Sequence, residues 1–168
     1  MTLSLTDVSP NDAPDVDALM TRVIARELAD AAVRAGTLEN VRSNLAWSMA
    51  HPERCCHLKC VAEEGIVGVI LVKQFWNLCS LFVAPELQRR GIGRELVRSC
   101  ARHFVRHGQF GFYLWVLKAN RARLFYEALG GQEIGEKTER LGLHSFSEIA
   151  YGWHDLAGLM APSDKMAV

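Results

Sequence analysis

The segment VAPELQRRGIGRELV places two arginines and two glycines at the point where an apolar strand is followed by an amphipathic helix. The backbone N–H groups in the first turn of a helix have no intrahelical partner, and this end carries about half a positive charge, so it binds phosphate. Gly91 and Gly93 let the backbone approach a ligand without an intervening Cβ, and Arg89 and Arg90 add positive charge. The segment therefore predicts that the helix begins with a phosphate-binding turn.

The turn is expected to run from Gln88 to Gly93, and its spacing excludes two common phosphate motifs. No Lys-Ser/Thr pair follows it, as in nucleotide hydrolases, and it lacks the third glycine of the dinucleotide fingerprint G-x-G-x-x-G. The chain has 19 Lys and Arg against 19 Asp and Glu, so it has no net charge to attract nucleic acid or an anionic membrane. Neither is expected as a partner, and recognition of phosphate is expected to be local.

A second motif begins at Asn120, which is predicted to cap a short helix, and reads N-x-x-x-x-F-Y-E-x-L-G-G over residues 120–131. The two motifs together resemble the GNAT superfamily of N-acetyltransferases, whose pyrophosphate motif is Q/R-x-x-G-x-G/A and whose co-substrate is acetyl-CoA. The resemblance covers residues 2–154. It implies an acyltransferase that uses acetyl-CoA and no metal.

The resemblance also implies roles for individual residues. Backbone N–H groups of residues 89–93 would hold the CoA pyrophosphate, and the strand end at Leu81 and Val83 would pair its backbone with the pantetheine arm. Asn120 would contact the cofactor beyond the pantetheine, and Tyr126 would be the general acid that protonates the departing thiolate. The cofactor-binding set is Leu81, Phe82, Val83, Gln88, Arg89, Arg90, Gly91, Ile92, Gly93 and Asn120.

One position departs from the family pattern. Many relatives have a glutamate six residues before the proline of the first motif, where it removes a proton from the amine through water; here Cys79 stands six residues before Pro85. A thiol with its ordinary pKa of about 8.5 is a poor proton acceptor at neutral pH. His144, Glu148 or His154 could substitute, a water chain could suffice for an amine of low pKa, and acyl transfer through Cys79 is a third possibility.

The elements that must position these residues follow from apolar periodicity. We expect strands at 2–7, 55–62, 66–75, 76–83, 111–117, 132–138 and 146–153, and helices at 13–30, from Thr37 to about His51, at 92–107 and at 120–129. A break at Gly36 would separate the first two helices, and the tail after Asp155 is expected to be loose. This order predicts one α/β domain over residues 1–168, with a mixed, mostly antiparallel sheet of about seven strands and about four helices.

The cysteines lie in segments that are expected to form the core, which favours reduced thiols in a cytoplasmic protein. The amino terminus has no basic, apolar leader, and the longest apolar run, IVGVILV, is too short to cross a bilayer. In HPERCCHLKC, His51, His57 and three cysteines could suggest zinc, but strand alternation divides them between two faces, so no metal is expected. The five cysteines are Cys55, Cys56, Cys60, Cys79 and Cys100.

We therefore expect an acetyl-CoA-dependent N-acetyltransferase that acts on a primary amine of a small molecule. The first two helices and the segment ADAAVRAGTLEN should line the acceptor side, where Glu27, Asp30 and Glu39 either attract a cationic amine or are ordinary solvated charges; Trp47 and Trp76 also lie where the family forms its acceptor pocket. Two alternatives stay open: a CoA-binding regulatory module without catalysis, suggested by Cys79, and an acetyltransferase of proteins or peptides. A homodimer is implied by the resemblance alone.

Overall fold

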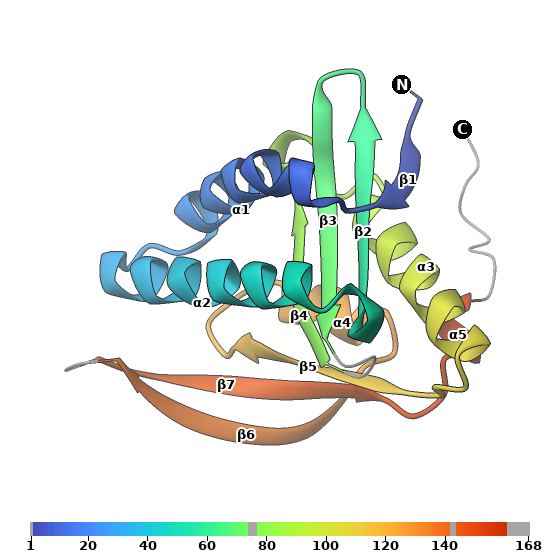
Figure 1. Cartoon of the computed structure of the whole chain (residues 1–168). Coiled ribbons are helices and arrows are strands. Elements are labelled where there is room, and N and C mark those ends of the chain that lie inside the picture. The colour runs from blue at the N-terminus through green and yellow to red at the C-terminus, as the bar shows by residue number, and fades with distance from the viewer. Residues whose placement is uncertain (1, 74–76, 142–143, 161–168) are drawn as a thin grey trace.

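The computed structural model describes residues 2–73, 77–141 and 144–160, and its seven strands form one sheet in the order β1-β2-β3-β4-β5-β7-β6 (Figure 1). Neighbouring strands are antiparallel except β4 and β5, which are parallel. This confirms the mixed α/β sheet. The strands are β1 Ser4–Asp7, β2 Cys55–Ala62, β3 Gly65–Lys73, β4 Asn77–Val83, β5 Phe112–Leu117, β6 Gln132–Leu141 and β7 His144–Trp153.

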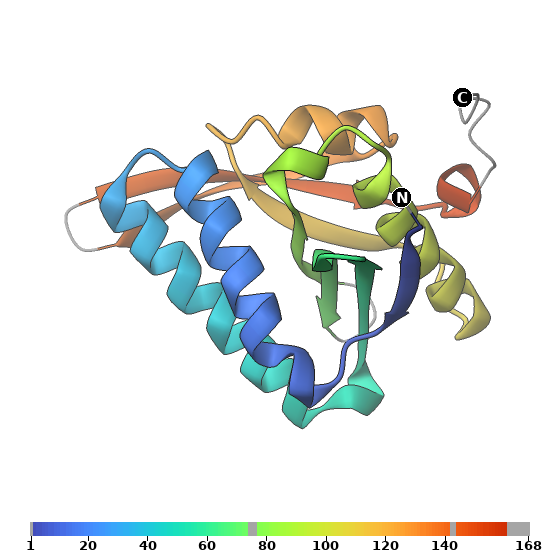
Figure 2. The same ribbon diagram turned by 90° about the horizontal axis from the view of Figure 1, so that it is seen from above.

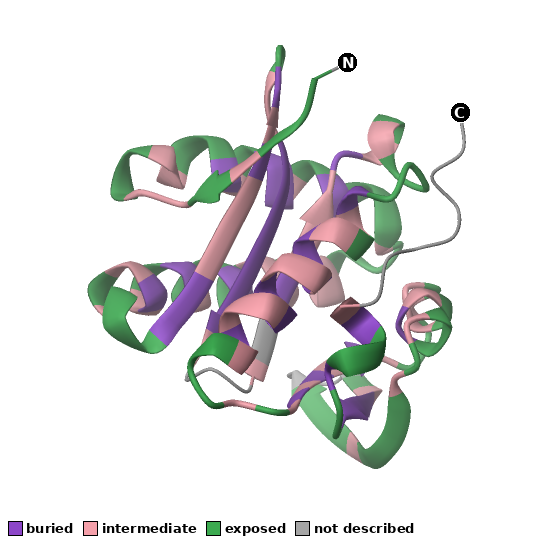
Figure 3. Cartoon of the chain, turned by 90° about the vertical axis from the view of Figure 1, so that its right-hand side faces the viewer, coloured by how far each residue is buried: buried purple, intermediate pink, exposed green. Residues whose placement is uncertain are grey.

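Helices cover both faces of the sheet. Helices α1 and α2 lie side by side on one face, and α3 and α4 lie on the other (Figure 2). Because both faces are covered, Val69 to Val72 in β3 are all fully buried, and burial concentrates on the central strands (Figure 3). The helices are α1 Ala13–Glu27, α2 Ala31–Ala50, α3 Ile92–Arg106, α4 Arg123–Ala128 and α5 Ala157–Met160.

Helix α2 begins earlier than the sequence predicted. Asp30 is its N-cap: the backbone of Asp30 is extended, and Oδ1 accepts hydrogen bonds from Ala32 N (2.8 Å) and Val33 N (2.9 Å). The expected break at Gly36 is wrong, because one glycine inside a helix costs only about 1 kcal/mol and the capped start and packed face offset that cost. The acceptor-side segment is therefore mostly helical, and Thr37 lies within α2.

The chain after Asp155 is also more ordered than expected. Asp155 Oδ1 accepts from Ala157 N (2.8 Å), and Arg98 Nε of α3 donates to Leu159 O (3.2 Å). Leu156 and Leu159, three residues apart, are buried against the core. The prediction of a loose tail is thus wrong for α5, while residues 161–168 lie outside the described residues.

Strand β4 has two irregularities. Leu71 of β3 pairs with Ser80 and Val72 pairs with Leu78, so Cys79 is an extra, bulged residue that shifts the two-residue alternation of β4 by one. On the other side, β4 pairs with β5 only at Asn77 and Leu78, and beyond these positions the described strands separate. The bulge and the separation lie in the same part of the sheet.

Candidate functional site

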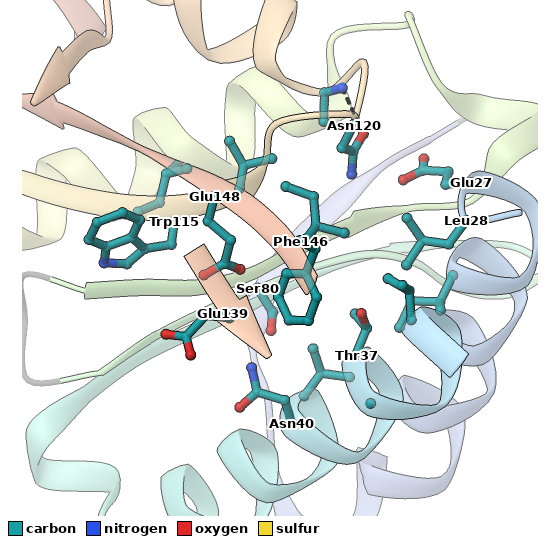
Figure 4. Close-up of a pocket in the computed structure, with 18 of the residues that line it drawn as sticks. Glu27, Leu28, Thr37, Asn40, Ser80, Trp115, Asn120, Glu139, Phe146 and Glu148 are labelled. Atoms are coloured by element: carbon teal, nitrogen blue, oxygen red, sulfur yellow. Dashed lines mark hydrogen bonds between the residues drawn. The ribbon is translucent and has the colours of Figure 1, made fainter. Parts of the chain in front are cut away.

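A pocket of about 470 Å³ lies where β4 and β5 separate, between the sheet and helices α1 and α2 (Figure 4). Residues of β6, β7 and the start of α4 complete its walls. This volume lies in the range of small-molecule sites. Four of the predicted site residues line it: Leu81, Phe82, Asn120 and Tyr126.

The backbone of β4 faces this gap at alternate residues. Ala84 N donates to Val67 O of β3 (2.8 Å), and backbone groups alternate sides along a strand. Leu81 and Val83 therefore direct their N–H and C=O groups away from β3, toward the gap, whereas the backbone of Phe82 pairs with β3. The open edge of β4 can thus hydrogen-bond an extended ligand through Leu81 and Val83.

Gln88 connects this edge to α1. Its Nε2 donates to Val83 O (3.2 Å) and to Glu27 Oε1 (3.0 Å). The carboxylate of Glu27 also lines the pocket, at the end where Tyr126 lies. Gln88 thus joins the end of β4 to the end of α1 beside the predicted phosphate-binding turn.

Residues 88–91 of the predicted turn form a loop ahead of the helix, so the turn is mostly not the first turn of α3, whereas the helix begins at Ile92 as the periodicity predicted. Arg89 has φ of +63° and Gly91 has φ of +87°, and α3 begins only at Ile92. The first helical hydrogen bond is from Glu95 N to Gly91 O (3.0 Å), so the N–H groups at the start of α3 have no intrahelical acceptor. These N–H groups, behind a loop with two left-handed residues, form a site of the kind that binds phosphate.

The two glycines differ in what a side chain at each position would meet, and neither observation shows the ligand access that the sequence predicted. A Cβ on Gly91 would meet nothing within 4 Å, but the positive φ favours glycine there. A Cβ on Gly93 would lie 3.4 Å from Phe125 Cζ and 3.7 Å from Val83 Cγ2. These are ordinary van der Waals distances, so a small side chain at position 93 would fit against α4 and β4.

Tyr126 is on α4 and is 8% exposed. Its ring lies 5.3 Å from that of Phe125 and 6.3 Å from those of Tyr151 and Trp153, measured between centroids. Burial raises the pKa of the Tyr126 phenol, and the negative charge of Glu27 raises it further. The phenol therefore stays protonated at neutral pH, as a proton donor must.

Asn120 lies at the turn before α4. Its Oδ1 accepts a hydrogen bond from Ala122 N (2.8 Å), so the side chain fixes the local turn while it lines the pocket (Figure 4). The helix proper starts three residues later, at Arg123. Asn120 Nδ2 is the donor that remains for a ligand.

A cluster of charges forms the pocket wall on β6 and β7. Lys137 Nζ lies 3.0 Å from Glu139 Oε1, 3.1 Å from Glu148 Oε2 and 4.6 Å from the centre of the Trp115 ring. Burial lowers the pKa of Lys137, but hydrogen bonds to Glu139 and Glu148 outweigh it and raise the pKa overall. Lys137 is therefore a fixed cation that holds the Glu148 carboxylate in place.

The expected substitutes for the missing glutamate have different outcomes. Glu148 lines the pocket, whereas His154 is exposed and outside the wall. The side chains of Cys79 and His144 lie outside the described residues.

Other acceptor-side expectations divide similarly. Glu27 lines the pocket, but Asp30 caps α2 and the exposed Glu39 is outside the wall. Trp47 stacks on His51 at 4.4 Å instead of lining the pocket, and Trp76 lies outside the described residues.

Ser80 is a pocket residue that the sequence analysis missed. It is 4% exposed, and its Oγ has no hydrogen-bond partner in the described part of the chain. The bulge at Cys79 puts Ser80 on the pocket side with Phe82. Nothing in the sequence indicates a bulge in this strand.

Four cysteines, Cys55, Cys56, Cys60 and Cys100, are buried, as predicted for core residues, and Cys56 Sγ lies 3.4 Å from Cys100 Sγ. Across the residues that the structure describes, no group of three or more His, Cys, Asp or Glu is placed to hold a metal ion. Within the same residues, no helix has the length and apolar character needed to cross a membrane. The cytoplasmic location and the homodimer stay predictions.

Comparison with known proteins identifies the family. The profile of the acetyltransferase (GNAT) domain matches residues 24–147, and the chain therefore belongs to the GNAT acetyltransferase family. An uncharacterized N-acetyltransferase of Bacillus subtilis (strain 168), YuaI, is 29% identical over 83 residues, which are 49% of this chain and 48% of that protein. The matched segment thus spans about half the length of this curated relative.

Solved structures show the same fold at low sequence identity. A GCN5-related N-acetyltransferase from Rhodopseudomonas palustris has a TM-score of 0.73 and 16% identity over 90% of this chain and 95% of that chain. The PaiA N-acetyltransferase from Thermoplasma acidophilum, solved in complex with coenzyme A, has a TM-score of 0.68 and 15% identity over 91% and 100%. These similarities show the fold of the family over 90–91% of this chain.

Proposed function

We propose that the protein transfers an acetyl group from acetyl-CoA to a primary amine of a small molecule. The observation that carries the proposal is the separation of β4 from β5. This separation exposes the backbone of Leu81 and Val83 beside the N–H groups at the start of α3. An extended ligand with a phosphate at one end fits this sequence of donors and acceptors.

The residues present fit acetyl-CoA. The N–H groups of the Gln88–Gly93 loop and of the start of α3 would bind its pyrophosphate, Leu81 and Val83 would bind the pantetheine arm, and Asn120 Nδ2 would donate to the cofactor. Gln88 would exchange its bond to Val83 O for one to the cofactor. When bound, acetyl-CoA supplies an activated acetyl group as a thioester.

The protein contributes orientation and proton transfer. Tyr126, whose phenol is protonated at neutral pH, donates its proton to the sulfur as the C–S bond breaks. Backbone N–H groups at the bulged part of β4 would polarise the thioester carbonyl. The amine attacks directly, so no acyl-enzyme is required.

The choice of a small molecule rests on the shape of the acceptor side. The pocket is bounded by α1 and α2 on one side and by β6 and β7 on the other, and its volume of about 470 Å³ suits a small ligand. Three carboxylates and two cations line the pocket, so its walls have an excess of negative charge: Glu27, Glu139 and Glu148 against Lys137 and Arg140. An amine is the complementary ligand for this excess of negative charge.

The melting temperature with and without excess acetyl-CoA tests the cofactor site. At about one hundred times its dissociation constant the ligand should add about 2.7 kcal/mol, or roughly 5–10 °C for a domain of this size. Gly91→Glu should abolish the increase, because its carboxylate repels the pyrophosphate. Gly91→Ala is the control, since it carries the same strain at φ of +87° without the charge, and it should retain most of the increase.

Turnover is tested with Tyr126→Phe in a thiol-release assay over a panel of small primary amines and a panel of peptides. We expect Tyr126→Phe to lower kcat by about 10²–10⁴ while the acetyl-CoA shift stays intact. Release of CoA only with peptides would overturn the small-molecule assignment. A full acetyl-CoA shift without turnover on either panel would indicate a regulatory module.

A further inference from the structure

Ser80 has a buried hydroxyl group that makes no hydrogen bond within the described part of the chain. The residue is 4% exposed, and Oγ neither donates to nor accepts from any group in the described residues. A buried hydroxyl without a partner costs about 1–3 kcal/mol, so such groups are uncommon and require an explanation. A ligand that supplies the missing hydrogen bond is one explanation, because Ser80 lines the pocket (Figure 4).

The strand bulge brings Ser80 to this position. Leu71 pairs with Ser80 and Val72 with Leu78, so Cys79 is inserted between two otherwise regular pairs. A bulge re-aims the side chains that follow it, and here Ser80 joins Phe82 on the wall that faces α1 and α2. A serine hydroxyl has three staggered rotamers, so Oγ can turn toward a ligand without backbone movement.

Glu148 belongs to the same pocket wall and is held in a fixed orientation. Its Oε2 lies 3.1 Å from Lys137 Nζ, and Lys137 is fixed by Glu139 and by the Trp115 ring. The Glu148 side chain is 20% exposed, so it is largely shielded from solvent but reachable from the pocket. The carboxylate can therefore accept a proton or a hydrogen bond from an amine without first being ordered.

We propose that Ser80 and Glu148 together form the seat of the acceptor nitrogen. Ser80 Oγ accepts a hydrogen bond from the amine, Glu148 accepts a second, and an apolar substituent lies against Phe146, Val33 and Val41 on the walls. The preferred acceptor class is a small primary amine that carries an apolar or aromatic group. This inference rests on the proposed function.

In the acetyl transfer, Glu148, Tyr126 and Ser80 each have one role. The bound ammonium first loses one proton to solvent, and the neutral amine then attacks the thioester carbon: the C–N bond forms, the C–S bond breaks, and the second proton lost by nitrogen goes to Glu148. Tyr126 gives its proton to sulfur, and the proton on Glu148 returns to the Tyr126 phenolate through solvent. Ser80 orients the nitrogen lone pair and transfers no proton. The products are the N-acetylated amine and CoA with a free thiol.

The test uses 2-phenylethylamine and 2-phenylethanol, which differ only in the group that the seat would recognise. Binding of both to the CoA-loaded protein is measured by NMR titration, and transfer to the amine by thiol release. We expect the wild-type protein to bind the amine at least about ten-fold more tightly than the alcohol. Ser80→Ala should raise Kd and KM for the amine about ten-fold, the equivalent of one lost hydrogen bond to a charged or strongly polar group. Glu148→Gln should remove most of the preference for the amine, because a hydroxyl can pair with either ligand whereas a carboxylate pairs best with the charged amine.

Ser48→Ala is the matched control. Ser48 is also buried and its Oγ also lacks a partner in the described chain, but it lies on α2 outside the pocket wall. Its replacement should change neither KM nor the preference for the amine. Glu148→Gln should lower kcat by about 10²–10⁴, with the acetyl-CoA thermal shift unchanged.

The outcomes separate this inference from the proposed function. An absent acetyl-CoA shift in the wild-type protein refutes the proposed function. With that shift intact, equal binding of the amine and the alcohol overturns the seat, and so does a Ser80→Ala protein with wild-type Kd and KM for the amine. The binding comparison decides even where 2-phenylethylamine is a poor substrate.

Discussion

Replacement of Ser80 by alanine should make the free protein more stable. The hydroxyl is buried and lacks a partner in the described chain, at a cost of about 1–3 kcal/mol. Removal of Oγ also loses a few van der Waals contacts of about 0.1–0.2 kcal/mol each. The net gain is therefore about 1 kcal/mol, which corresponds to a melting temperature about 2–4 °C higher for a domain of this size.

Calorimetry of the ligand-free protein and urea unfolding followed by far-UV circular dichroism both measure this change. Ser48→Ala should also increase stability, because it removes a similar hydroxyl and introduces a better helix former into α2. A Ser80→Ala protein that melts below the wild type would refute the reasoning, because Oγ would then be satisfied before any ligand binds. Higher stability together with lower amine affinity would identify Ser80 as a residue retained for function at a cost in stability.

Three further predictions concern the fold. Hydrogen bonds from Lys59 (2.6 Å) and Ser9 lower the pKa of Asp12 to about 2, so its contribution is present above the unfolded pKa of about 3.9 and lost as pH falls toward 2. Asp12→Asn should cost about 1–2 kcal/mol at pH 7 in urea unfolding and flatten the acid dependence below pH 4. Burial lowers the pKa of His57 to about 4, so wild-type stability should fall between pH 6.5 and pH 4, where the unfolded chain binds the proton first; a His57→Gln protein whose unfolding midpoint still falls there would contradict this. Asp30→Ala should lower stability by about 1 kcal/mol, and an unchanged melting temperature would contradict its role as the N-cap of α2.

Features that depend on local sequence were predictable. The apolar run of β3 and the four-residue apolar spacing of α3 reflect burial on two faces and on one face, and both elements lie where the periodicity predicts. The loop around Gly91 and the turn at Asn120 are also short-range features, and the pocket contains Tyr126 and Asn120 as expected.

Features that depend on competition between local signals, or on contacts between residues far apart in the sequence, could not be predicted. Asp30 and Thr37 are both good caps, and the sequence did not show that Asp30, which accepts hydrogen bonds from Ala32 N and Val33 N, would start α2. The bulge at Cys79 follows from pairing with β3 and changes which side chain enters the pocket. The charge cluster joins Lys137 of one strand to Glu148 of the next and to the ring of Trp115, and each residue alone is typical of an exposed strand.

The outer strand β6 affects how readily copies of the protein associate at high concentration. It is one free edge of the sheet, and the other edge, β1, has only four residues. Exposed carboxylates on β6 lie at Glu133, Glu136 and Glu139, so a second copy that pairs antiparallel about Glu136 opposes every one of them with another carboxylate. Repulsion between these carboxylates therefore disfavours edge-to-edge polymerisation, and salt that screens the repulsion makes polymerisation easier, so high ionic strength is the condition to avoid when the protein is concentrated or stored.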